Sequence, residues 1–191
     1  MESRFGAIEG VIRTRVGYAG GQKADPTYHH IGDHTETVQI DYDPTRISYD
    51  DLLAVFWRSH APSAHTISRQ YLNAIFYHDE TQRDAALASK EALEKRGGRN
   101  IRTEVLPLRS FTMAEDYHQK YLLKRNQVLT AELTRIYPQA ADFVASTAVS
   151  RINGYLGGYG TRDQLRKEID QLGLSPKGRA ILEKRVGDRG E

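Results

Sequence analysis

The sequence contains no cysteine among its 191 residues, which excludes disulfide bonds and any thiol chemistry from the chain as given. The chain also lacks a large excess of either sign of charge, since 27 lysines and arginines stand against 25 aspartates and glutamates. Such a small basic surplus does not indicate a nucleic-acid-binding surface. We therefore expect a protein without nucleic acid as a partner and without a thiol nucleophile in the chain as given.

Long apolar runs are missing as well. No stretch approaches the ~18 apolar residues that a membrane helix requires. The chain also does not open with the basic segment and apolar run of a secretory signal. The sequence thus predicts no membrane partner and a cytoplasmic location. Its length fits a single domain with an appendage.

Short segments with strand and helix patterns alternate along the first two-thirds of the chain. Strands are predicted at residues 11–18, 36–42, 72–78 and 101–106, the last bounded by Pro107. Helices are predicted at 81–96, stopped by Gly97 and Gly98, and at 114–124. Another helix starts with Ser48 as its N-cap and buries Leu52, Leu53, Phe56 and Trp57. This order predicts an α+β fold of two layers, with helices covering one face of a mixed or antiparallel sheet.

The last third of the chain predicts a separate appendage. Residues 150–160 are rich in glycine and tyrosine, which favours a loop that packs its tyrosines onto the domain. Thr161 caps a predicted helix to about Leu172, and Ser175 and Pro176 open another to about Val186. Alternating charges predict solvated helix faces, which leaves open a plain structural extension or a module that binds a partner. The predicted domains are residues 1–125 and 126–191.

Several separated motifs in the first part of the chain carry a family resemblance. They are RVGYAGG at residues 15–21, DPTY at 25–28, DHTE at 33–36, QY at 70–71 and AEDYHQKYL at 114–122. In this order and spacing they are similar to the A-type peptide methionine sulfoxide reductases. The resemblance runs from Met1 to about Leu123, roughly two-thirds of the chain. It implies a ferredoxin-like split β-α-β core with a mixed sheet.

The resemblance also implies roles for three residues. Glu36 stands at the family's catalytic glutamate, where burial at the start of a strand would favour its acid form. Tyr28 and Tyr71 match the two tyrosines whose hydroxyls hold the sulfoxide oxygen. Taken by themselves, without the flanking motifs, these residues fit an exposed glutamate at a strand edge and amphipathic core tyrosines.

The sequence departs from the family at its most important position. The family attacks the sulfoxide with a cysteine in a Gly-Cys-Phe-Trp-Gly segment, whereas this chain opens at Met1 with the helix that follows. Serine or threonine cannot substitute, because the nucleophile must be oxidised to a sulfenic acid and then regenerated. Three explanations stay open: a start called at an internal methionine, with cysteine or selenocysteine directly upstream; a silent protein that binds methionine sulfoxide; and a helper module.

Two loops also differ from the family. The loop at residues 60–69 is shorter and carries no acid, and the loop ahead of Glu36 is about two residues shorter. His34, His60 and His65 lack the spacing of a metal site, so no metal or other cofactor is expected.

The resemblance implies reduction of methionine S-sulfoxide in oxidised proteins or peptides, with electrons from a thioredoxin-like thiol reductant. The alternative is a catalytically silent module that binds methionine sulfoxide or its peptides.

Overall fold

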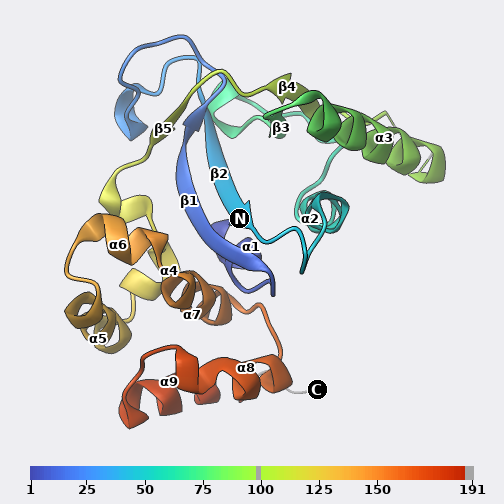
Figure 1. Ribbon diagram of the computed structural model, residues 1–191. Coiled ribbons are helices and arrows are strands. Elements are labelled where there is room, and N and C mark those ends of the chain that lie inside the picture. The colour runs from blue at the N-terminus through green and yellow to red at the C-terminus, as the bar shows by residue number, and fades with distance from the viewer. Residues whose placement is uncertain (98–99, 188–191) are drawn as a thin grey trace. The chain divides into compact units, whose positions relative to one another are not determined.

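The computed structural model describes residues 1–97 and 100–187 and has an α+β fold (Figure 1). Its strands are β1 (Val11–Ala19), β2 (Thr35–Tyr42), β3 (Ala74–Tyr77), β4 (Glu104–Pro107) and β5 (Phe111–Met113). Its helices are α1 (Glu2–Gly6), α2 (Tyr49–Trp57), α3 (Glu80–Gly97), α4 (Tyr121–Lys124), α5 (Gln127–Ile136), α6 (Ala140–Ala145), α7 (Thr147–Gly157), α8 (Arg162–Glu168) and α9 (Pro176–Gly187). Short 3₁₀ helices are η1 (Tyr28–His30), η2 (Arg69–Tyr71), η3 (Asp116–His118) and η4 (Ile169–Gln171).

The strands form two small sheets. In the first, the order is β2-β1-β5, and β5 pairs antiparallel with the end of β1. The register places Gly17 opposite Met113 and Ala19 opposite Phe111. A Cβ at position 17 would lie 2.4 Å from the Phe111 ring, so glycine is needed for this close pairing. In the second sheet, β3 and β4 run parallel.

The chain divides into two compact units by its internal contacts. Unit 1 holds residues 1–15, 38–46 and 116–191, and unit 2 holds residues 16–37 and 47–115. Strands β1 and β2 contribute residues to both units. This division does not test the sequence boundary at residue 125, which stays a prediction.

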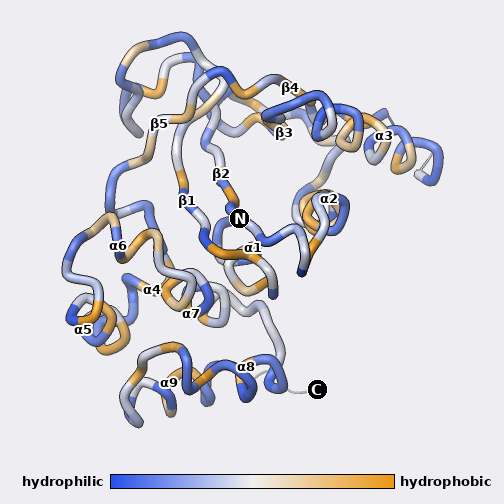
Figure 2. Tube along the Cα trace, viewed as in Figure 1, coloured by the Kyte–Doolittle hydropathy of each residue, from blue (hydrophilic) through white to orange (hydrophobic). Residues whose placement is uncertain are grey.

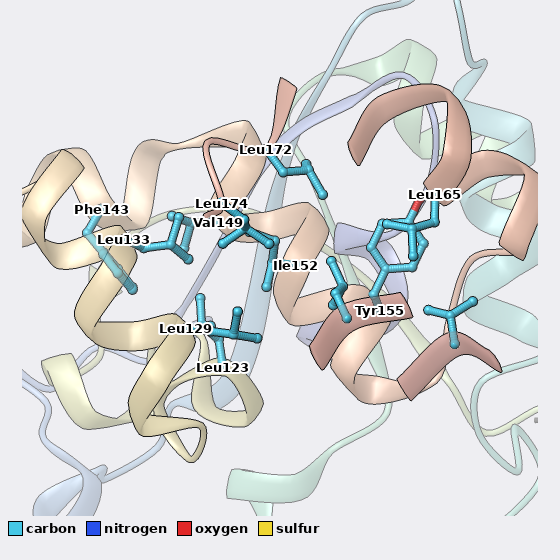
Figure 3. Packing of buried hydrophobic residues seen from close by; sticks show 12 residues of the cluster. Leu123, Leu129, Leu133, Phe143, Val149, Ile152, Tyr155, Leu165, Leu172 and Leu174 are labelled. Carbon is cyan, nitrogen blue, oxygen red and sulfur yellow. The ribbon is translucent and has the colours of Figure 1, made fainter. Parts of the chain in front are cut away.

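The core of unit 1 is built by the helices of the C-terminal part. Its buried residues are Leu123, Leu129, Leu133, Phe143, Val149, Ile152, Tyr155, Leu165, Leu172, Leu174, Leu182 and Val186. Figure 3 shows these side chains gathered between the helices, with Leu172 and Leu174 contributed by the turn before α9. In α7 the members of this cluster recur every three residues, which is the spacing of one helix face, and the residues between them are buried as well. Figure 2 shows hydrophilic and hydrophobic residues alternating along α8 and α9, as expected for helices with one buried side.

Unit 2 has a smaller core between α2, α3 and β3. Leu53, Ile75 and Ala86 are buried there, with Phe56 and Trp57 packed against them. The Trp57 Nε1 donates to the Ser89 Oγ at 2.9 Å. The N-cap expected at Ser48 is present as a capping box with Asp51.

Most predicted elements are confirmed, with small shifts at their ends. Thr161 caps α8 by accepting from the Gln164 N–H, and α9 begins at Pro176. β4 begins at Glu104 and includes Pro107, which was expected to bound it. α3 ends at Gly97, while Gly98 lies outside the described residues. β5, α5 and α6 were not predicted.

None of the helices in the described ranges is both long and apolar enough to cross a membrane.

The predicted loop at residues 150–160 is wrong, because α7 runs through it to Gly157. Its glycines serve close packing and helix termination. A Cβ at Gly154 would lie 2.5 Å from the Ala7 backbone nitrogen, so glycine lets α7 approach the end of α1. Gly158 then ends α7 in the left-handed conformation, with φ of 94°.

The predicted helix at residues 114–124 is also wrong. Only η3 and the short α4 are helical there, and Lys120 between them is left-handed, with φ of 53°. Its side chain is fully buried. The Lys120 Nζ lies 2.7 Å from the Glu2 Oε1 and donates to the Thr14 Oγ1 at 2.9 Å, and its backbone N–H donates to the Glu2 Oε2 at 2.9 Å. Reaching these partners takes the backbone out of the helical conformation.

Replacement of Lys120 by methionine should strongly destabilise the protein. Lys120→Met leaves the Glu2 carboxylate buried without its counter-charge, and breaking such a pair typically costs about 3–5 kcal/mol. Urea unfolding monitored by circular dichroism measures the loss. The control is Lys95→Met, because Lys95 pairs with Glu91 on the surface of α3 and exposed pairs contribute little. Equal losses for the two variants would contradict this account.

Candidate active site

The loop between β1 and β2 is fixed by the side chain of His34, which is 2% exposed. The Gly21 N–H donates to its Nδ1 at 3.3 Å, and its Nε2 lies 2.9 Å from the Lys23 carbonyl oxygen. Because Nδ1 accepts, Nε2 carries the proton and donates to that carbonyl. A Cβ at Gly21 would lie 2.4 Å from the His34 ring, so glycine permits the contact. These bonds hold the start of β2, where Glu36 lies.

Asp33 adds a second tie between the two ends of this loop. Its carboxylate accepts the backbone N–H groups of Gln22 at 2.8 Å and Lys23 at 3.1 Å. These two hydrogen bonds lower the pKa of Asp33, because they favour the charged carboxylate. The loop that carries Tyr28 is thus closed by Asp33 as well as by His34.

The η2 helix lies beside the first residues of β2. The Thr35 Oγ1 donates to the Arg69 carbonyl oxygen at 2.9 Å, and the Gln70 Nε2 donates to the Glu36 Oε1 at 2.7 Å. Both bonds join residues that are 34 positions apart in the sequence. They bring Tyr71, the last residue of η2, to the carboxylate of Glu36.

Tyr28 completes this cluster from η1. A side-chain hydrogen bond between Tyr28 and Tyr71 is the first cause that raises the pKa of Tyr71, and the nearby charge of Glu36 raises it further. The structure therefore brings together all three residues that the sequence singles out. Their roles in a reaction remain predictions at this point.

The site is open to solvent. Tyr71 is 56% exposed, Glu36 is exposed, and Tyr28 is partly buried. The expectation that Glu36 is buried is therefore wrong. The Gln70 amide holds its carboxylate at the surface, at the second residue of β2. A ligand can reach the carboxylate and the Tyr71 hydroxyl directly.

Sequence reasoning missed Glu115, which contacts the backbone of Tyr28. Its Oε1 accepts the Tyr28 N–H at 3.0 Å, and its Oε2 accepts the Tyr18 hydroxyl at 2.6 Å. Glu115 lies inside the AEDYHQKYL motif, which was the available signal. No local pattern links it to Tyr28, which is 87 positions away.

Each histidine considered for a metal site has a partner within the protein. His60 contacts the Phe56 carbonyl oxygen and the Thr103 Oγ1, both at 3.0 Å, and burial lowers its pKa. His65 contacts Arg102 at 3.1 Å. Across residues 1–97 and 100–187 there is no group of three or more histidine, aspartate or glutamate side chains that could hold a metal ion.

The structure places a carboxyl group near two tyrosine side chains, and these are groups that can exchange hydrogen bonds with a polar ligand. The sequence model of the peptide methionine sulfoxide reductases matches residues 1–151. This chain therefore belongs to that family. The match covers more than half of the chain and includes all the residues of the site.

Individual relatives agree with this assignment. A peptide methionine sulfoxide reductase of Drosophila melanogaster is 45% identical over 177 residues, which are 92% of this chain and 71% of the relative. Peptide methionine sulfoxide reductase A5 of rice is 38% identical over 190 residues, or 95% of this chain and 73% of the relative. The crystal structure of Mxr1 from Saccharomyces cerevisiae in its reduced form matches with a TM-score of 0.58 and 28% identity, covering 62% of this chain and 74% of that one.

The hydrogen bond between the two tyrosines can be measured through the titration of Tyr71. Tyr28→Phe removes the bond that favours neutral Tyr71, so the pKa of Tyr71 should fall toward its ordinary value. Glu36→Gln should lower it less, since the charge of Glu36 is a smaller cause. The measurement is a pH titration by NMR of protein labelled with ¹³C at the tyrosine Cζ, with the Tyr71 signal assigned from Tyr71→Phe. An unchanged pKa in Tyr28→Phe would rule out the bond.

Proposed function

We propose that this chain reduces the S-epimer of methionine sulfoxide in oxidised proteins and peptides. In this proposal, a cysteine or selenocysteine nucleophile and a thioredoxin-like reductant come from outside these 191 residues. The observation that carries the proposal is the meeting of Glu36, Tyr28 and Tyr71 at one solvent-accessible place in a chain of this family. The relatives are named as reductases, which does not favour a silent binding module.

In the proposed reduction of the sulfoxide, the nucleophile, the glutamate and the two tyrosines have separate roles. The nucleophile attacks the sulfoxide sulfur, and the sulfur–oxygen bond weakens as negative charge develops on oxygen. Glu36 delivers a proton to this oxygen, and the hydroxyls of Tyr28 and Tyr71 donate hydrogen bonds to it. The sulfoxide sulfur is reduced to a thioether, while the nucleophile is oxidised to a sulfenic acid or its selenium counterpart and takes the oxygen. Thiols of the reductant then regenerate the nucleophile and release water.

The exposure of Glu36 fits a site that closes on its substrate. A general acid works best when its pKa lies near the working pH, and a carboxyl reaches that range when water is removed from it. The bound side chain and the segment that carries the nucleophile would cover Glu36 and provide this. Gln70 then holds the carboxyl in place during the exchange, since it donates to one of its two oxygens.

We also propose the finer architecture that the resemblance implies. Residues 1–125 form a reductase domain with a ferredoxin-like split β-α-β core, and residues 126–191 form a helical extension. The antiparallel β1–β5 pair, the parallel β3–β4 pair and the helical structure of residues 127–157 and 162–187 support this proposal.

The 191-residue chain by itself should show no thiol-dependent turnover, since it offers no group that can become a sulfenic acid. A protein extended before Met1 by Gly-Cys-Phe-Trp-Gly, together with an apolar strand segment ahead of it, should gain activity. The assay is reduction of dabsylated methionine S-sulfoxide with dithiothreitol. The matched control carries serine in place of the added cysteine. Turnover by the unextended chain would overturn the mechanism.

In the extended protein, Glu36→Gln should lower turnover by ~10²–10⁴ at neutral pH, the usual range for a positioned general acid. Affinity for a methionine sulfoxide peptide should change much less, because the amide still donates a hydrogen bond. Tyr28→Phe and Tyr71→Phe should each cost less than Glu36→Gln, since each removes one of several donors. Steady-state kinetics give the turnover numbers, and calorimetry gives the affinities. Near-normal turnover of Glu36→Gln would mean that the glutamate has only a structural role.

A further inference from the structure

Glu115 lies at a fixed place at the end of the first sheet. It follows β5 by two residues, and the Ala114 N–H between them donates to the Val16 carbonyl oxygen at 3.0 Å. This bond continues the antiparallel pairing of β5 with β1 beyond Met113. The residue directly before Glu115 is therefore held by a sheet hydrogen bond, and this fixes where the half-buried side chain of Glu115 leaves the backbone.

The two carboxylate oxygens of Glu115 have different partners. Oε2 accepts the hydroxyl of Tyr18, which is 1% exposed, at 2.6 Å. Oε1 accepts the backbone N–H of Tyr28 at 3.0 Å. Hydrogen bonds to a charged carboxylate are shorter and stronger than those between neutral groups. Tyr18 thus fixes one oxygen from a buried strand, and the other oxygen reaches the first residue of η1.

We propose that Glu115 is a positioning residue of the active site, which holds the hydroxyl of Tyr28 against Tyr71 through the backbone of η1. The inference rests on the proposed function and adds a residue to it. The N–H at the start of a short helix has no partner within that helix, so a fixed acceptor determines where the helix begins. Because Tyr28 is that first residue, its ring leaves the backbone directly beside the bond to Glu115. Loss of the acceptor frees η1 to shift, and with it the hydroxyl.

A purely structural role of Glu115 and a positioning role predict different effects for the same variants. If Glu115 serves only to satisfy the buried Tyr18 hydroxyl, Tyr18→Phe and Glu115→Ala have the same consequences. If Glu115 positions Tyr28, Tyr18→Phe leaves the bond to Oε1 intact and affects stability alone. Glu115→Gln is the conservative variant, because the amide oxygen still accepts the Tyr28 N–H while the amide nitrogen faces the Tyr18 oxygen.

The first test uses the 191-residue protein and needs no activity. Glu115→Ala should lower the pKa of Tyr71 in the ¹³C-tyrosine NMR titration, as Tyr28→Phe does. Tyr18→Phe and Glu115→Gln should leave that pKa at the wild-type value. Glu115→Asp is a second variant, in case alanine unfolds the protein, and it should lower the pKa of Tyr71 because its shorter side chain cannot reach the Tyr28 N–H from the same backbone position. An unchanged Tyr71 pKa in a folded Glu115→Ala or Glu115→Asp protein would overturn the inference.

The second test uses the extended protein and a double-variant cycle. Glu115→Ala should lower turnover by the same factor as Tyr28→Phe, and the two changes combined should lower it no further. Glu115→Gln should restore most of the turnover, and Tyr18→Phe should keep it near normal. Losses that multiply in the double variant would show that Glu115 acts independently of Tyr28. An inactive extended wild-type protein would count against the proposed function, while the NMR test of Glu115 would still stand.

Discussion

The ammonium group of Lys120 is out of contact with water, and unit 1 is organised around the need to neutralise it. An isolated buried charge costs many kcal/mol, so its partners must be close and numerous. They come from the first helix through Glu2 and from β1 through Thr14. The left-handed backbone at Lys120 and the break between η3 and α4 accompany these contacts, which anchor α1 together with its packing against α7.

The candidate site in unit 2 is held by a different means. Glu36 and Tyr71 lie near the surface, and hydrogen bonds to the backbone fix the segments that carry them. His34 and Asp33 close the loop before β2, and Thr35 holds η2 beside it. Such an arrangement keeps the functional side chains accessible while the backbone beneath them stays rigid. The two units thus differ in how they hold a charged group: unit 1 buries the ammonium group of Lys120, whereas unit 2 keeps the carboxyl group of Glu36 at the surface.

Local patterns in the sequence were enough to predict much of the fold. The two strands β1 and β2 and the cap at Ser48 were predicted from neighbouring residues, and these elements are confirmed, although burial does not alternate strictly along either strand. The errors arise where a distant partner decides. Residues 114–124 have helical spacing, but Glu2 takes Lys120 out of the helix. The glycines of 150–160 look like loop residues until Ala7 is known to pack against Gly154. At the site, the motif order predicted Glu36, Tyr28 and Tyr71, while the exposure of Glu36 and the contact of Glu115 depend on the folded chain.

The contact between α1 and α7 has a consequence for biosynthesis. A Cβ at Gly6 would lie 2.4 Å from the Ser150 carbonyl oxygen, so the first helix packs directly against a helix about 145 residues later. Domains form as the chain leaves the ribosome, from the N-terminus onward. All residues of unit 2 have been synthesised by position 115, whereas α1 must wait for α7. Helix α1 is therefore among the last segments described here to reach its final place, and during that interval it is accessible to chaperones and proteases.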